Sequence, residues 1–394
     1  MLKILTTCLF CTVLMQTANA TPYIPNTPDQ VLEKLPATTN SSVKQFKNLR
    51  LQLASDPNNI QLASQLTRLY IEQSREEGDP RYLGYAQAAL APWWKLTQPP
   101  VDILILRATL LQSTHQFDKS LADLNLVLKL DHNNGQAWLT RATILQVQGE
   151  YAKALQSCEQ LYSLAPALIT LTCTSNVNNL SGHAAQSYQG LKQGLEQEND
   201  SSPSIQIWVL TLLAEMAERL GDIAAAEKHF QHAIGLAEPD SYLLGAYSDF
   251  LLDQHRPQEV AKLLKAKTKI DPLLLRYAEA LTAMHLPEGK IQIEAIRQRF
   301  DAAMMRGDTV HQREQSRFEL RLMHNPKRAL EIARLNWEIQ KEPADARVYL
   351  EAALALNDKN AALPLIGWIE SHHLEDAALK RLVSNQSAQY KATK

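Results

Sequence analysis

Histidine and cysteine are the residues in this sequence whose spacing could support metal or redox chemistry. His229 and His232 are three positions apart in a segment with helical periodicity, and His372 and His373 are adjacent. Residues three apart lie on one face of a helix. A transition-metal site needs three or four converging ligands, and neither pair has an obvious third partner. We therefore interpret these histidines as surface residues and expect neither a metal site nor a cofactor.

The two cysteines beyond the first 20 residues flank a predicted helical turn. Cys158 precedes the turn at Ala165-Pro166 and Cys173 follows it, each seven or eight residues away. Two antiparallel helices would hold both thiols at a similar height, and an oxidising compartment then favours a disulfide. Closing a loop of about 15 residues would stabilise the fold by roughly 3 kcal/mol. The alternative is a pair of small buried thiols, and both stay open because bonding needs Cα atoms within about 7 Å.

Motifs of common enzyme families are absent from the sequence. It contains no G-x-S-x-G, no G-x-x-x-x-G-K-[ST], no H-E-x-x-H, and no G-x-G-x-x-G between a strand and a helix. The 40 basic and 42 acidic residues give a formal net charge of −2, whereas nucleic-acid binders are normally basic. We therefore expect a protein that is not an enzyme and does not bind nucleic acid.

The N-terminus has the pattern of a signal peptide over residues 1–20. A positive start at Lys3 precedes an apolar stretch from Ile4 to Met15, and Ala18-Asn19-Ala20 provides a small-x-small cleavage site. The stretch is shorter than the roughly 20 residues that span a bilayer, and no later run is long enough. We expect cleavage after Ala20, no membrane insertion of the mature chain, and a periplasmic location, with secretion as the alternative.

The elements that would position any site are helices in a repeating pattern. The segments "LRATLLQ" and "TRATILQ" superimpose at a spacing of 34 residues, which aligns Arg107 with Arg141 and Ala108 with Ala142. A fixed period of this length is typical of a solenoid, in which each helical hairpin buries its apolar face against its neighbours. No convincing strand pattern is present, so the repeat predicts an all-α fold.

The repeated residues resemble the tetratricopeptide repeat family. Trp138, Gly149, Tyr151, Ala154 and Pro166 follow its pattern of W-x2-L-G-x2-Y, then A-x3-F, then P. The resemblance implies an α-α superhelix of about eight or nine helix-turn-helix repeats over residues 43–383. The remaining segments are an extended lead-in at 21–42 and a flexible tail at 384–394. The clearest repeats are 101–134, 135–168, 207–240 and 241–272.

The closing block "NWEIQKEPADARVYLEAALAL" also resembles uncharacterised bacterial periplasmic members of the family. The family resemblance implies a scaffold that binds a partner protein or peptide through the concave face. Two other roles stay open: a bridging subunit of a cell-envelope assembly for secretion, pili or polysaccharide export, and an accessory protein that handles a ligand.

Family members bind partners through the first helix of each repeat, so alignment implies a set of concave-face residues. Those of the earlier repeats are neutral, whereas those of the later repeats are mainly acidic and include two aromatic residues. This pattern suggests that the acidic half receives a neutral or basic segment stacked on Trp208 and Tyr242; the alternative is solvated charges and a core Trp208. The set is Gln112, Thr143, Gln146, Trp208, Thr211, Glu215, Glu218, Tyr242, Asp249 and Asp253.

Overall fold

A computed structural model describes residues 41–198 and 201–392 of the chain. Every element in these ranges is a helix. The predicted signal peptide, and the predicted lead-in as far as residue 40, lie outside the described residues. The chain forms two units, residues 1–48 and 49–394, and all contacts that build the candidate site lie within the second.

The helices are short and most of them pair with the next one across a tight turn. The first part of the chain contains α1 (Ser41–Ser55), α2 (Ile60–Glu77), α3 (Arg81–Ala89), α4 (Ala91–Trp94), α5 (Val101–Ser113) and α6 (Phe117–Leu130). The middle part contains α7 (Gly135–Val147), α8 (Tyr151–Glu159), the 3-10 helix η1 (Gln160–Ser163), α9 (Ala167–Asn179), α10 (Ala184–Gln197), α11 (Pro203–Leu220) and α12 (Ile223–Leu236). The last part contains α13 (Ser241–Asp253), α14 (Pro257–Leu264), α15 (Asp271–Ala283), α16 (Glu288–Met305), α17 (Gln312–Arg321), α18 (Pro326–Trp337), α19 (Pro343–Ala355), α20 (Lys359–Ser371) and α21 (Ala377–Ala392).

Each of the four clearest predicted repeats contains one helical hairpin. The pairs are α5/α6, α7/α8, α11/α12 and α13/α14, and α11 begins at Pro203, ahead of the predicted repeat start at 207. Near the C-terminus, α21 is helical as far as Ala392. The predicted flexible tail, residues 384–394, therefore begins inside this helix.

The turn inside a hairpin places one residue in the left-handed backbone region. Gly149 and Gly221 have this conformation, with φ of 78° and 83°. In other hairpins a histidine or asparagine takes the same place, which suits these two residue types better than most others. These are His115, His255, His285, His324 and Asn357. Several of the chain's histidines are therefore turn residues.

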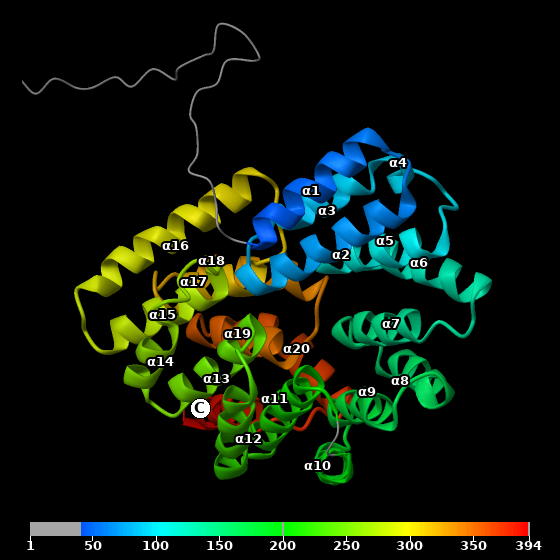
Figure 1. The fold of residues 1–394 in the computed structure, drawn as a ribbon. Helices are drawn as coiled ribbons and strands as arrows, with labels where there is room; N and C mark the ends of the chain where they lie inside the picture. The colour runs from blue at the N-terminus through cyan, green and yellow to red at the C-terminus, as the bar shows by residue number, and fades with distance from the viewer. Residues whose placement is uncertain (1–40, 199–200, 393–394) are drawn as a thin grey trace, which may run out of the picture. The chain divides into compact units, whose positions relative to one another are not determined.

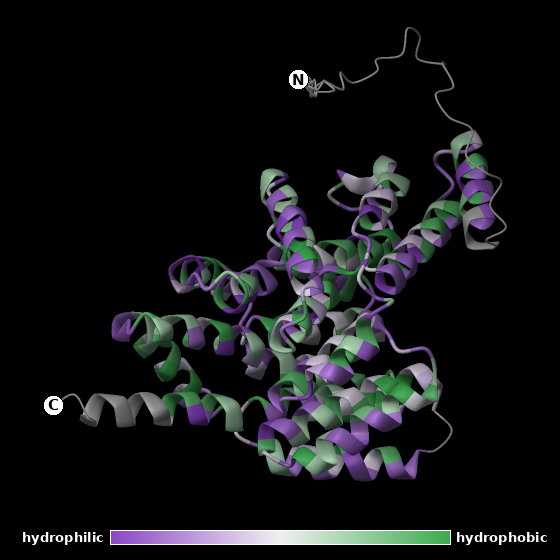
Figure 2. Cartoon of the chain, turned by 90° about the vertical axis from the view of Figure 1, so that its left-hand side faces the viewer, coloured by the Kyte–Doolittle hydropathy of each residue, from purple (hydrophilic) through white to green (hydrophobic). Residues whose placement is uncertain are grey.

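The core is built from the apolar faces of these helices. Figure 2 shows hydrophobic and hydrophilic residues alternating along the helices, as expected for helices that bury one face. Small residues lie where two helices of a hairpin pack closely: Ala142 on α7 is 1% exposed and Ala154 on α8 is fully buried. Such packing leaves each hairpin with an uncovered face that the next hairpin covers.

Within the second unit, the C-terminal helices return to the middle repeats. Figure 1 shows α19 and α20 between α7 and α13. The N–H of Lys341 donates to the carbonyl of Val147 at 2.7 Å, and the N–H of Ala184 donates to Glu375 at 2.9 Å. One apolar cluster joins Leu145 on α7 to Leu350 on α19. The inner side of the repeat stack is therefore partly filled by the chain's own last helices.

Candidate functional site

The residues predicted for the concave face lie on the first helices of four hairpins, but their environments differ. Gln112 on α5 is half-buried. Thr143 on α7 is exposed and donates its hydroxyl to the carbonyl of Leu139 at 3.0 Å. Gln146, also on α7, is half-buried and lines a cavity of about 320 Å³. Of these three neutral residues, Gln146 is the one that lines this cavity.

Two of the predicted residues on α11 do not present their side chains to a groove. Thr211 is 2% exposed, and its hydroxyl donates to the carbonyl of Ile207 at 2.7 Å. Trp208 is half-buried and packs against the apolar cluster around Leu210 and Leu213. The prediction that Thr211 contacts a partner is therefore wrong, because Thr211 lies on the face of α11 that packs into the core. Trp208 agrees with the alternative prediction, in which its indole packs against the core.

Tyr242 and Glu215 meet at the edge of the cavity. The Tyr242 hydroxyl on α13 donates to Glu215 Oε1 on α11 at 2.8 Å. Tyr242 is 56% exposed and lines the cavity of about 320 Å³ together with Gln146 and Asn176. Burial raises the pKa of the Glu215 carboxyl above its ordinary value, although Arg219 and the Tyr242 hydrogen bond oppose this. Of the predicted residues, Gln146, Glu215, Tyr242 and Asp249 all line this cavity.

The acidic residue Asp249 is paired within the chain. Arg276 on α15 donates to both of its carboxylate oxygens, at 2.9 and 2.5 Å, and Arg317 on α17 donates to Oδ1 at 2.6 Å. Burial alone would raise the pKa of Asp249, but the two guanidinium groups outweigh it and hold this pKa well below its usual range. Asp249 is therefore a charged group with its partners already in place.

The pairing continues as an alternating chain of charges across α13, α15, α17 and α19. Arg317 donates to Glu279 at 2.7 Å, and Arg321 donates to Glu351 at 3.0 Å. Arg347 donates to Glu351 at 2.8 Å and also forms an ion pair with Asp253. Because Asp249 and Asp253 both lie on α13, the two ends of this chain of ion pairs meet on one helix.

These arginines change the expected chemistry of the acidic half. A second cavity of about 190 Å³ adjoins the first and is lined by carboxylates and by seven arginines. Six of the seven come from α15, α17, α19 and α21, beyond the last of the four clearest predicted repeats. One signal was available: Arg313, Arg317 and Arg321 are spaced by four residues, which places them on one helix face. The predicted acidic surface is in fact balanced by cations.

Glu218 is the exception among the predicted acids. It lines the smaller cavity, and among the residues that the structure describes it has no hydrogen-bond or ion-pair partner. Burial, followed by the negative charges of Asp253, Asp249 and Glu215, raises its pKa to about 8. Glu218 is therefore largely protonated near neutral pH and acts as a neutral group within the charged network.

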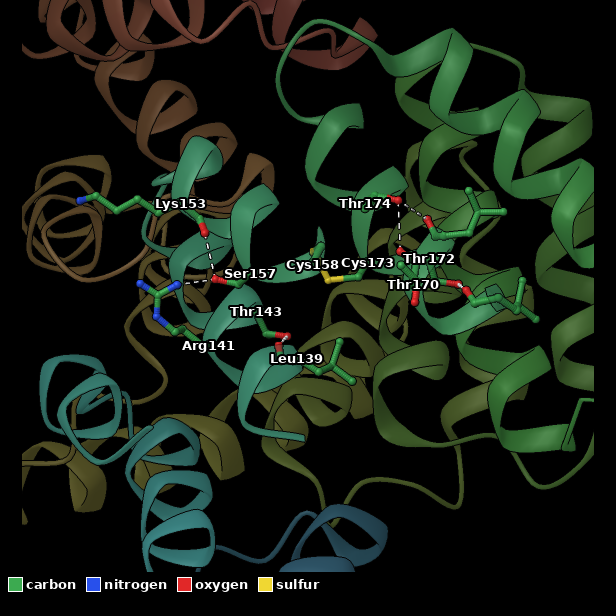
Figure 3. Close-up of a disulfide and its surroundings, with 12 residues drawn as sticks. Leu139, Arg141, Thr143, Lys153, Ser157, Cys158, Thr170, Thr172, Cys173 and Thr174 are labelled. Atoms are coloured by element: carbon green, nitrogen blue, oxygen red, sulfur yellow. Dashed lines mark hydrogen bonds between the residues drawn. A yellow bond between two sulfur atoms is a disulfide. The ribbon is translucent and has the colours of Figure 1, made fainter. Parts of the chain in front are cut away.

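The cysteines lie on facing helices. Cys158 on α8 and Cys173 on α9 have Cα atoms 5.5 Å apart and are joined by a disulfide, as Figure 3 shows. Both are buried, at 0% and 6% exposure. The bond crosses from the second helix of one repeat to the first helix of the next, and so ties two neighbouring repeats together.

His229 and His372 contact other side chains, whereas His232 is exposed on α12. His229 lies 3.0 Å from the Tyr188 hydroxyl, and the ring of His372 stacks on Trp368 with centroids 4.3 Å apart. His373 has a left-handed backbone in the turn before α21. Across the described ranges, no group of three or more His, Cys, Asp or Glu side chains could hold a metal ion. In the same ranges, no helix combines the length and apolar content needed to cross a bilayer.

Comparison with known proteins identifies one repeat directly. Residues 209–240, which contain most of α11 and all of α12, match the family model of the tetratricopeptide repeat. No curated protein sequence matches the chain.

Several solved structures are similar in part. A tetratricopeptide repeat protein from Parabacteroides merdae is 17% identical, with 58% of this chain and 86% of that chain covered and a TM-score of 0.43. Human IFIT1, in a dimer with PPP-AAAA, is 11% identical over 84% of this chain and 77% of that chain, with a TM-score of 0.48. The P58(IPK) TPR domain is 13% identical, with 90% of this chain and 99% of that chain covered and a TM-score of 0.23.

The family match falls on a hairpin that stacks between similar hairpins on both sides. The matched segment includes the buried small residues Ala214, Ala226 and Ala233, which the pattern requires where helices cross. The chain is an all-α protein over the described residues, and it contains a tetratricopeptide repeat.

Proposed function

We propose that this protein is an exported, non-enzymatic scaffold that holds a segment of a partner protein at the inner cavity beside Tyr242. Tetratricopeptide folds suggest protein-interaction scaffolds because their stacked hairpins present an extended inner surface. The observation that carries the proposal is the cavity of about 320 Å³, in which Tyr242 is 56% exposed while the neighbouring acid Asp249 is already paired.

The cavity lining favours an uncharged segment with an apolar side chain. Gln146 and Asn176 supply amide groups that can both donate to and accept from a peptide backbone. The Tyr242 ring and Leu212 provide apolar surface, and aromatic residues are enriched at the centres of interfaces. A charged segment would have to compete with ion pairs that the cavity wall already makes.

Two features support export. The signal-peptide pattern of residues 1–20 predicts cleavage and delivery to the periplasm, with secretion as the alternative. The disulfide between Cys158 and Cys173 is the kind of bond that persists in oxidising compartments.

Capture of a partner by matched variants tests the binding site. Tyr242→Ala should reduce recovery of the co-purifying protein from envelope extracts at least tenfold, because it removes the exposed ring of the cavity. Tyr162→Ala is the control, since Tyr162 is 73% exposed and lies on η1, away from the cavity lining. Equal recovery with both variants would reject the cavity as the binding site.

A further inference from the structure

A third cavity lies on a different side of α11 from the inner surface. It has a volume of about 400 Å³, and helices α10 and α12 form its walls. Leu210 and Leu213 of α11 line it, whereas Leu212 and Glu215 of the same helix line the inner cavity. We call this third cavity the outer cleft. Its volume falls within the range of small-molecule sites, about 300 to 1,000 Å³.

The lining of the outer cleft is apolar at its base. Leu210 and Leu213 are 2% and 0% exposed, and the partly buried Leu195 and Ala225 flank them. This base can accept a hydrocarbon or aromatic group without any hydrogen-bond requirement, and burying such a group is favourable.

Two lysines and two acids line the outer cleft. Lys192 on α10 and Lys228 on α12 have no hydrogen bond or ion pair to any residue that the structure describes. Of the two acids in the lining, Glu198 accepts from the N–H of Leu168 at 3.0 Å at the start of α9, and Glu196 is exposed on α10. Lysines on both walls are therefore free to bind an anion.

The surroundings of His229 also favour the binding of an anion in the outer cleft. The Tyr188 hydroxyl and His229 Nε2 lie 3.0 Å apart, and their rings meet edge to face at 5.8 Å. Burial, and then the positive charges of Lys192 and Lys228, lower the pKa of His229 to about 4. Asp222 opposes this effect but does not cancel it. The nearby lysine charges that act on this ring would also favour an anion beside it.

We propose that the outer cleft binds a small organic anion, with its carboxylate between Lys192 and Lys228 and its apolar body against Leu210 and Leu213. This site is separate from the partner site at Tyr242, and its residues are not those of the inner cavity. The base selects an apolar body, and the lysines select the charge.

Calorimetric titration of the full mature chain with 4-phenylbutanoate tests the site, with neutral 4-phenylbutanamide as the matched probe. The carboxylate should bind at least tenfold more tightly than the amide. The double variant Lys192→Gln/Lys228→Gln should lose at least tenfold in affinity. Lys262→Gln, an exposed residue of α14 outside the cleft, should bind as the native protein does.

The position of binding is checked by the NMR signals of the histidine rings. The signal of His229 should move and saturate with the carboxylate, while that of His324, a turn residue between α17 and α18, should stay unchanged. Equal affinity for the amide, no effect of the double variant, no heat of binding, or a static His229 signal would each overturn the proposal.

Discussion

Arg347 on α19 forms a two-pronged ion pair with Asp253 on α13, although the two residues are 94 positions apart in sequence. The Nη2 to Oδ1 distance is 2.8 Å. Asp253 was expected to face a partner, and it instead holds the C-terminal repeats against the middle ones. The pair marks the point at which the repeat stack closes on itself.

Removing Arg347 should destabilise the protein. Arg347→Ala leaves Asp253 and Glu351 without their shared cation, and losing one partner of a partly buried network costs about 1 to 3 kcal/mol in the free energy of unfolding. Chemical denaturation measures the change. Arg297→Ala on the exposed face of α16 is the control and should leave stability unchanged; equal effects of both variants would contradict a role for the network.

A side chain at position 149 should also loosen the closure. Gly149 has a φ of +78°, and a Cβ there would lie 3.1 Å from Trp368 Cζ2 on α20. Gly149→Ala should therefore lower the free energy of unfolding by about 1 to 2 kcal/mol. Gly190→Ala in the middle of α10 meets no atoms and should raise stability by about 0.5 to 1 kcal/mol. Thermal denaturation distinguishes the two, and a stabilised Gly149→Ala protein would contradict the contact.

Much of this architecture could be predicted from the sequence, because in-phase repeats determine local packing. Arg107 and Arg141 revealed the period, and the helical hairpins around them follow from it. The closure could not be predicted in the same way, because it depends on curvature summed over many repeats. Arg347 and Asp253 therefore gave no local signal.

The disulfide should contribute to stability. Cys158 and Cys173 are separated by 15 residues, and closing a loop of this size stabilises by roughly 3 kcal/mol. The double variant Cys158→Ala/Cys173→Ala should unfold at a lower temperature than the native protein under oxidising conditions. Under reducing conditions the difference should become small, and a difference that reduction does not change would argue against the bond.

Glu218 should make stability fall as pH rises. Its folded pKa of about 8 lies above its ordinary value of 4.5, so between these values the folded state binds more protons than the unfolded state. The stability of the native protein relative to Glu218→Gln should then decrease from pH 5 to pH 8. Denaturation at both pH values measures this difference, with Glu72→Gln on the exposed side of α2 as the control. A constant difference would mean that Glu218 is not protonated in the fold.

Site-specific photo-crosslinking tests the proposed partner site most directly. A photoreactive phenylalanine analogue replaces Tyr242 in one variant and Tyr162 in another, and crosslinked products from intact envelopes are identified by mass spectrometry. The inner-cavity site predicts one dominant protein adduct at position 242 and none of that protein at position 162. The same adduct at both positions, or no protein adduct at 242, would contradict it.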